Sequence, residues 1–134
     1  MTHPEEAAPR RLSIAIVDDD ASVRVSLRRL CEALELSATT YASGPEFLAA
    51  LAGGLRPPDC LLLDAQMPGM TGLELQRHLV ADRAGIPAIV FTADDTPDVL
   101  ANYAAAGIAA FLRKPASGDE LLAAVAQAVS TPRA

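Results

Sequence analysis

The sequence predicts an α/β domain with a doubly wound parallel sheet of five strands. Three observations support this prediction. Short, almost continuously apolar runs alternate five times with segments of helical periodicity, and such runs are typical of parallel strands covered on both faces. The chain has 134 residues, which suits a single domain with one core. Right-handed crossovers between successive parallel strands then place helices on both sides of the sheet.

The expected strands differ in how apolar they are. The second strand contains two threonines and is less apolar than the others, so we expect it at an edge of the sheet. A flavodoxin-like strand order of 2-1-3-4-5 places it there. The five expected strands comprise residues 12–17, 36–41, 59–63, 88–91 and 109–112.

The segments between the strands predict five helices with ordinary start and stop signals. Asp20, Ser43 and Thr71 can each cap the helix that follows, and glycines end two of the helices. The expected helices comprise residues 21–34, residues 45–51, a segment that begins after Thr71, residues 97–106 and residues 118–129. The last helix is expected to turn four apolar residues toward the sheet, namely Leu121, Leu122, Val125 and Val129.

Composition and charge argue against several classes of protein. A net charge of −6 and a pI of about 4.7 argue against a nucleic-acid-binding surface on this domain, because such surfaces are basic. No apolar stretch reaches the roughly 18 residues of a membrane span, and the start of the chain lacks the apolar core of a signal peptide. Cys31 and Cys60 lie in apolar patterns and are expected to be buried thiols, so we expect a cytoplasmic location.

The chain is expected to contain one domain, at residues 10–129. Residues 1–9 contain two prolines and two glutamates without periodicity, which predicts a disordered tail. Residues 130–134 are expected to form a C-terminal tail or the start of a linker. Whether the domain stands alone or was cut from a longer protein is left open by the sequence.

Polar residues follow four of the five expected strands. Asp18 and Asp19 follow the first, Asp64 the third, Thr92 the fourth and Lys114 the fifth. In an open parallel sheet the carboxyl ends of the strands meet at one edge, where ligands bind, so we expect these side chains to converge. Clustered carboxylates repel one another unless a cation lies among them, and oxygen ligands suit Mg²⁺. A carboxylate can also accept a phosphoryl group.

Each of these signals is weak when taken alone. A run of three aspartates after a strand is more often a turn with a helix cap, and Asp20 is suited to that role. A single threonine is usually solvated or capping, and Lys-Pro is usually part of a loop. The combination of complementary groups at four strand ends is what favours a site for phosphoryl chemistry.

The chain resembles the receiver domain of bacterial two-component response regulators. The resemblance covers residues 11–129, nearly the whole chain. It rests on four motifs in order, which are Val17-Asp18-Asp19, Asp64 followed by Met67-Pro68-Gly69-Met70-Thr71-Gly72, Thr92-Ala93 and Lys114-Pro115.

The resemblance implies a role for each matching residue. Asp64 would accept a phosphoryl group from a sensor histidine kinase or a phosphotransfer protein. Asp18, Asp19, Asp64 and the backbone carbonyl of Gln66 would hold Mg²⁺. Lys114 would contact the phosphoryl group.

The resemblance also implies a conformational switch. Thr92 would be the switch hydroxyl, and Phe111 occupies the aromatic switch position, where a tyrosine is often found. The Lys114–Pro115 peptide bond would be cis. The altered surface would be the face formed by residues 97–106, 109–112 and 118–129, which would control a partner or an output domain, such as a DNA-binding domain for transcription regulation.

The same face carries few charges and many alanines. The alanines are Ala101, Ala104, Ala105, Ala106, Ala123, Ala124, Ala126 and Ala128. Their low polarity predicts a mostly apolar docking face that could support a homodimer. The alternative, that alanine merely favours helix, carries equal weight.

Competing functions belong to other classes. A Mg²⁺-dependent phosphatase could form an aspartyl-phosphate on Asp64. Such enzymes normally need an added cap or a second acid two residues after the nucleophile, where this chain has Gln66. A flavin- or nucleotide-binding module would need a glycine-rich phosphate loop after the first strand, where this chain has three acids. A phosphorylation-independent interaction domain also stays open. The leading expectation is a regulatory domain that catalyses only its own phosphorylation and dephosphorylation, not an enzyme acting on other substrates.

Overall fold

The computed structural model describes residues 11–93 and 96–130. Five parallel strands form one sheet in the order β2-β1-β3-β4-β5, which confirms the predicted order and the edge position of the second strand. The strands are β1 (Ser13–Val17), β2 (Ser37–Tyr41), β3 (Cys60–Asp64), β4 (Ala88–Thr92) and β5 (Ala110–Arg113). The predicted tail at residues 1–9 lies outside the described residues, as do residues 131–134.

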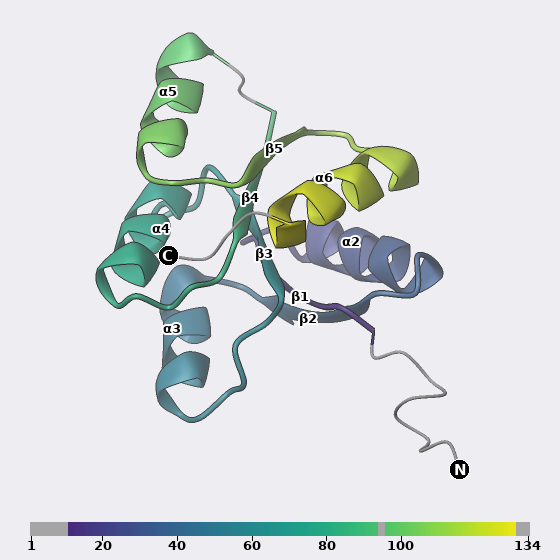
Figure 1. Ribbon diagram of the computed structural model, residues 1–134, viewed down its shortest axis with the longest axis horizontal. Coiled ribbons are helices and arrows are strands. Elements are labelled where there is room, and N and C mark those ends of the chain that lie inside the picture. Colours follow the sequence, from purple (N-terminus) through teal and green to yellow (C-terminus); the bar gives the residue numbers. More distant parts are fainter. Residues whose placement is uncertain (1–10, 94–95, 131–134) are drawn as a thin grey trace.

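Helices cover both faces of the sheet (Figure 1). The described helices are α2 (Ala21–Ala33), α3 (Gly44–Ala52), α4 (Gly72–Ala81), α5 (Pro97–Ala105) and α6 (Gly118–Ser130). Side chains alternate along each strand, so Ile14 and Ile16 pack with α2 and α6, whereas Ala15 and Val17 pack with α3 and α4. Two large apolar clusters therefore sandwich the sheet.

The expected capping residues begin three of the helices. The Asp20 carboxylate accepts hydrogen bonds from the N–H groups of Ser22 and Val23, and the Ser43 hydroxyl accepts one from the N–H of Glu46. Thr71 and Glu74 form a reciprocal capping box at the start of α4. Each cap is worth about 1 kcal/mol of stability, and the last also fixes the chain just after the β3–α4 loop.

The predicted inward face of α6 is wrong in part. Leu121 and Val125 are buried as expected and Val129 is half-buried, but Leu122 is 44% exposed. Ala124 and Ala128 are buried against the sheet, not on the outward face. Small side chains let the helix approach the strands closely, and residue type alone does not distinguish a buried alanine from a surface one.

The ends of the elements differ from the predicted ranges by about one residue. The third strand was expected at residues 59–63 and lies at 60–64, so Asp64 is its last residue. The last helix continues through Ser130, one residue beyond the expected domain end. Cys31 and Cys60 are free thiols and are both buried. None of the helices in the described residues is long and apolar enough to cross a membrane.

Candidate functional site

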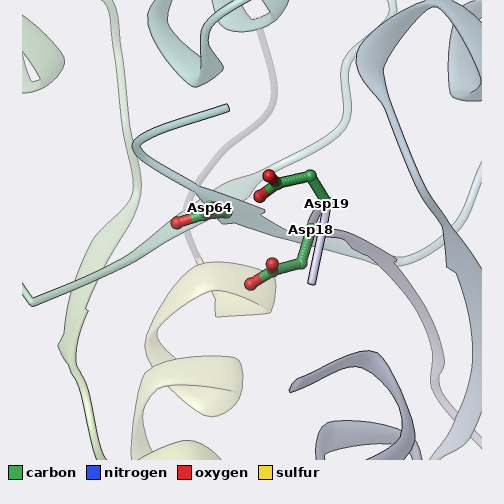
Figure 2. A group of neighbouring side chains, drawn as sticks. All are labelled: Asp18, Asp19 and Asp64. Atoms are coloured by element: carbon green, nitrogen blue, oxygen red, sulfur yellow. The ribbon is translucent and has the colours of Figure 1, made fainter. Parts of the chain in front are cut away.

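Three carboxylates meet at the carboxyl edge of the sheet. Val17 of β1 pairs with Leu63 of β3, so the residues that follow leave the sheet side by side. Each of Asp18, Asp19 and Asp64 offers an oxygen, and these oxygens lie within 4.8 Å of one another (Figure 2). Asp18 and Asp64 are buried, whereas Asp19 is exposed. The structure thus brings the three predicted acids together.

The three consecutive aspartates, residues 18–20, have two different structural roles. The backbone N–H of Asp20 donates a 2.9 Å hydrogen bond to Oδ1 of Asp18, and the Arg24 guanidinium donates to the Asp18 carbonyl oxygen at 2.7 Å. These contacts hold Asp18 in the cluster. The Asp20 side chain turns instead to the first turn of α2, where the Ser22 N–H donates to it at 2.8 Å. The capping interpretation is therefore correct for Asp20, and the cluster interpretation for Asp18 and Asp19.

Lys114 brings a positive charge to this cluster from the end of β5. Its Nζ lies 3.1 Å from Oδ1 of Asp64 and 3.3 Å from Oδ2 of Asp18. The ammonium also lies 5.1 Å from the centre of the Phe91 ring, on the neighbouring strand. The backbone N–H of Lys114 donates to the Thr92 carbonyl oxygen at 2.9 Å, and the Lys114–Pro115 peptide bond is cis.

The electrostatics of Asp64 reflect its crowded surroundings. Burial raises the pKa of Asp64, and the charge of Asp18 raises it further, against the opposing effects of Lys114 and the Gln66 N–H. Burial alone would lower the pKa of Lys114, but its hydrogen bond to Asp64 and the charges of Asp64 and Asp18 outweigh this, so that pKa is raised. The net rise in the pKa of Asp64 means that burial and the charge of Asp18 outweigh the favourable contact with Lys114.

The donor set fits a hard divalent cation. Three carboxylates supply only oxygen ligands, and Lys114 is the cation found hydrogen-bonded to two of them. Mg²⁺ is typically bound through one or two carboxylates, with several waters retained. Asp18, Asp19 and Asp64 could therefore hold Mg²⁺. The Gln66 backbone carbonyl stays a predicted ligand, while the Gln66 N–H donates a long 3.4 Å hydrogen bond to Oδ1 of Asp64.

The two expected switch residues lie on adjacent strands. Val90 of β4 pairs with Phe111 of β5, and Thr92 is two residues further along β4 on the same face of the sheet. Thr92 is buried, whereas the Phe111 side chain is 39% exposed. The aromatic ring is therefore partly turned out to solvent in this structure.

Sequence reasoning missed one residue near the site. The buried Tyr103 of α5 donates its hydroxyl hydrogen to the carbonyl oxygen of Ala65, the residue after Asp64, over 2.9 Å. The available signal was a single large aromatic residue in an alanine-rich helix. Its target could not be found without knowing how α5 packs against the β3–α4 loop.

Comparisons with known proteins agree with this geometry. Residues 14–126 match the family described as the response regulator receiver domain. The DNA-binding transcriptional regulator NtrC of Salmonella typhimurium is 39% identical over 115 residues, which cover 86% of this chain and 24% of NtrC. The transcriptional regulatory protein FixJ of Azorhizobium caulinodans is 36% identical over 117 residues, which cover 87% of this chain and 54% of FixJ.

A solved structure leads to the same family. The crystal structure of a response regulator receiver protein from Burkholderia phymatum is 40% identical, with a TM-score of 0.77, and the match covers 92% of this chain and 98% of that one. The chain spans only about a quarter to a half of the length of the two curated relatives. The match to a receiver domain nevertheless covers most of this chain. The chain therefore belongs to the response regulator receiver domains of two-component signalling.

Proposed function

We propose that this domain is a phosphorylation-controlled switch in which Asp64 accepts a phosphoryl group from phosphohistidine on a sensor kinase or phosphotransfer protein. The observation that carries the proposal is the position of the Asp64 carboxylate, in the acidic cluster and 3.1 Å from the Lys114 ammonium. An Asp64 oxygen attacks phosphorus and the P–N bond breaks. The imidazole nitrogen keeps the bonding electron pair and takes up a proton.

The side chains of the site divide the work of this transfer. Lys114 orients the Asp64 carboxylate before transfer and attracts the phosphoryl oxygens afterwards. Asp18 and Asp19, with Asp64 and the Gln66 carbonyl, would hold Mg²⁺. When bound, this ion would neutralise charge on the phosphoryl oxygens. The domain would then catalyse only its own phosphorylation and dephosphorylation.

The response to phosphorylation would run through β4 and β5. The phosphoryl group offers oxygen acceptors to the Thr92 hydroxyl, and movement of Thr92 would leave space for the Phe111 ring on the same face of the sheet. Phosphorylation would thus favour a second conformation that is rarely populated without it. The α5–β5–α6 surface would change shape and present the signal.

The α5–β5–α6 surface is proposed as the docking face for a second copy or an output domain. Phe111 and Leu122 are both exposed there, which supports an apolar contact. Light scattering with and without phosphorylation tests for the dimer, and an unchanged mass would place the signal elsewhere. By likeness to NtrC and FixJ, we propose that the whole protein regulates transcription, and the two buried free thiols fit a reducing cytoplasm.

Intact mass spectrometry after incubation with acetyl phosphate and Mg²⁺ tests the acceptor. We expect a gain of one phosphoryl group, lost on chelation and in Asp64→Asn. Asp59→Asn is the matched control, since Asp59 precedes the same strand at its far end and bonds to Ser13. No gain in the wild type would contradict the proposal and favour a phosphorylation-independent interaction domain. Sustained hydrolysis of added phosphoesters would favour the phosphatase.

A further inference from the structure

The link between Tyr103 and Ala65 joins α5 to the peptide group beside the acceptor. The Tyr103 hydroxyl donates to the Ala65 carbonyl oxygen at 2.9 Å, and both residues are buried in a small cluster with Val90. Burial raises the pKa of Tyr103 to about 12, a hydrogen bond with the Leu73 backbone works in the opposite direction, and the negative charge of Asp64 adds to the rise. The hydroxyl therefore keeps its proton and acts as a donor at physiological pH.

The carbonyl that Tyr103 holds belongs to the peptide whose N–H faces the acceptor. The Ala65 carbonyl and the Gln66 N–H are the two ends of one planar peptide unit. That N–H donates to Oδ1 of Asp64 at 3.4 Å. Fixing the oxygen fixes the direction of the N–H, and a donor on the carbonyl polarises the N–H, which strengthens its bond to the carboxylate.

The Tyr103 hydroxyl packs closely against the start of α4. Gly72, the first residue of α4, lies against this link: a Cβ atom there would be 2.7 Å from the Tyr103 hydroxyl oxygen and closer still to the Asp64 carbonyl oxygen. A buried hydroxyl that loses its acceptor costs free energy. A displacement of α5 would therefore either move the Ala65–Gln66 peptide with it or break the hydrogen bond between Tyr103 and Ala65.

We propose that Tyr103 is a positioning residue that couples α5 to the phosphoacceptor through the Ala65–Gln66 peptide. The inference rests on the proposed function, since it assigns Asp64 the acceptor role. With the hydrogen bond made, the Gln66 N–H holds the Asp64 carboxylate in a fixed orientation for attack. By reciprocity, a change at Asp64 alters the free energy of α5, and a partner that moves α5 alters the acceptor.

Tyr103→Phe tests the coupling, because it removes the hydroxyl and keeps the ring. Tyr41→Phe is the matched control, since Tyr41 is the second of the two tyrosines and stacks edge-on to Phe47 in another cluster. The rate of phosphorylation is measured against acetyl phosphate concentration. We expect Tyr103→Phe to lower the limiting rate about twofold to tenfold, with the half-saturating concentration unchanged, since one hydrogen bond is lost. Tyr41→Phe should match the wild type.

Two further measurements do not depend on that rate. In the unphosphorylated protein, the Gln66 amide proton should shift to lower frequency in Tyr103→Phe but not in Tyr41→Phe, because its hydrogen bond weakens. The chain contains no tryptophan, so Tyr41→Phe leaves Tyr103 as the single strong near-ultraviolet chromophore. Phosphorylation of this variant should change the Tyr103 absorption band.

The outcomes separate this inference from the proposed function. An unchanged or raised limiting rate in Tyr103→Phe, or a Gln66 amide shift equal to the wild type, would overturn the positioning role. If Tyr103→Phe does not fold, the Tyr41→Phe variant still tests the coupling. A Tyr103 absorption band that is the same before and after phosphorylation of Tyr41→Phe would overturn it. No phosphorylation of the wild type would contradict the proposed function instead, while the amide shift would still test the hydrogen-bonded link.

Discussion

The helices α6 and α5, which lie on opposite faces of the sheet (Figure 1), are held against it by different kinds of contact. On one side, α2 and α6 bury a continuous apolar cluster that includes Leu27 and Leu121. On the other face, among the described residues, the cluster beneath α5 has three buried members, Ala65, Val90 and Tyr103. Side-chain hydrogen bonds also help to hold α5 there. Tyr103 reaches the Ala65 carbonyl, and the Gln76 amide nitrogen reaches the Ala106 carbonyl at 3.1 Å.

This difference indicates which part of the domain can move at low cost. Apolar burial on the α2–α6 side contributes stability that any displacement would lose. A helix held by a small cluster and a few hydrogen bonds belongs to the low-stability end of a fold, from which moving elements are drawn. The acceptor lies between these two regions, so its phosphorylation is expected to change the α5–β5–α6 surface by moving α5 and β5, while α2 and α6 keep their packing against the sheet.

The largest expected effect comes from opening a cavity in the α2–α6 cluster. Leu121→Ala should lower the free energy of unfolding by about 2–5 kcal/mol, because the buried side chain leaves a void. Leu122→Ala is the matched control on the same helix and should cost under about 0.5 kcal/mol, since the side chain is 44% exposed. Urea unfolding measures both. Equal losses would mean that α6 is rotated from its position in this structure.

A smaller effect is expected at the contact between α4 and the Tyr103 link. Gly72→Ala should cost about 1–3 kcal/mol, since the added Cβ would collide with the Asp64 carbonyl and the Tyr103 hydroxyl. Gly118→Ala, at the first residue of α6, meets only ordinary contacts at 3.5 Å from Leu30 and 3.6 Å from Leu34. It should be neutral or stabilise by up to about 1 kcal/mol. Thermal unfolding measures both variants. Equal stability of Gly72→Ala and Gly118→Ala would argue against the close packing at Gly72.

The smallest expected effect is the dependence of stability on pH at the acidic edge. The pKa of Asp64 is higher in the folded than in the unfolded protein, so protonation of Asp64 favours the folded state. This stabilisation is fully present below the ordinary carboxyl pKa of about 3.9 and is lost as the pH rises through the folded-state pKa. In chelator, Asp64→Asn should therefore be more stable than the wild type at pH 7. The difference between their free energies of unfolding should decrease as the pH falls toward about 3.

Asp20→Asn provides a comparison of opposite sign. Hydrogen bonds from the Ser22 hydroxyl and from the N–H groups of Val23 and Ser22 lower the pKa of Asp20, so its contribution is present at neutral pH and lost on acidification. The wild type should be slightly more stable than Asp20→Asn at pH 7. An Asp64→Asn variant that is less stable than the wild type at pH 7 would show that Lys114 outweighs burial at the acceptor.

Much of the fold and of the acidic site could be predicted from sequence, because both follow local patterns. Continuous apolar runs predicted the strands, and polar residues at their ends predicted that Asp18, Asp19, Asp64 and Lys114 would meet. A parallel sheet brings those ends together whatever the details of packing. Pattern and capping residues were therefore sufficient for the element order and for the carboxylate cluster.

The errors concern features that depend on tertiary packing, such as which face of a helix is buried. The inward position of Leu122 was wrong, and the burial of Ala124 and Ala128 was missed, because helix rotation depends on how closely α6 approaches the sheet. The Tyr103–Ala65 hydrogen bond spans 38 residues of sequence, and neither residue type predicts its partner. Such contacts follow from the placement of whole elements, which periodicity does not specify.

Hydrogen exchange followed by mass spectrometry tests the central contrast most directly. Peptides from α5 and α6 are compared before and after phosphorylation with acetyl phosphate and Mg²⁺. We predict that α5 amides exchange faster than α6 amides at rest and that phosphorylation changes the exchange of α5 while α2 and α6 keep theirs. Equal protection of α5 and α6 at rest, with phosphorylation-dependent changes confined to α2 and α6, would contradict the account.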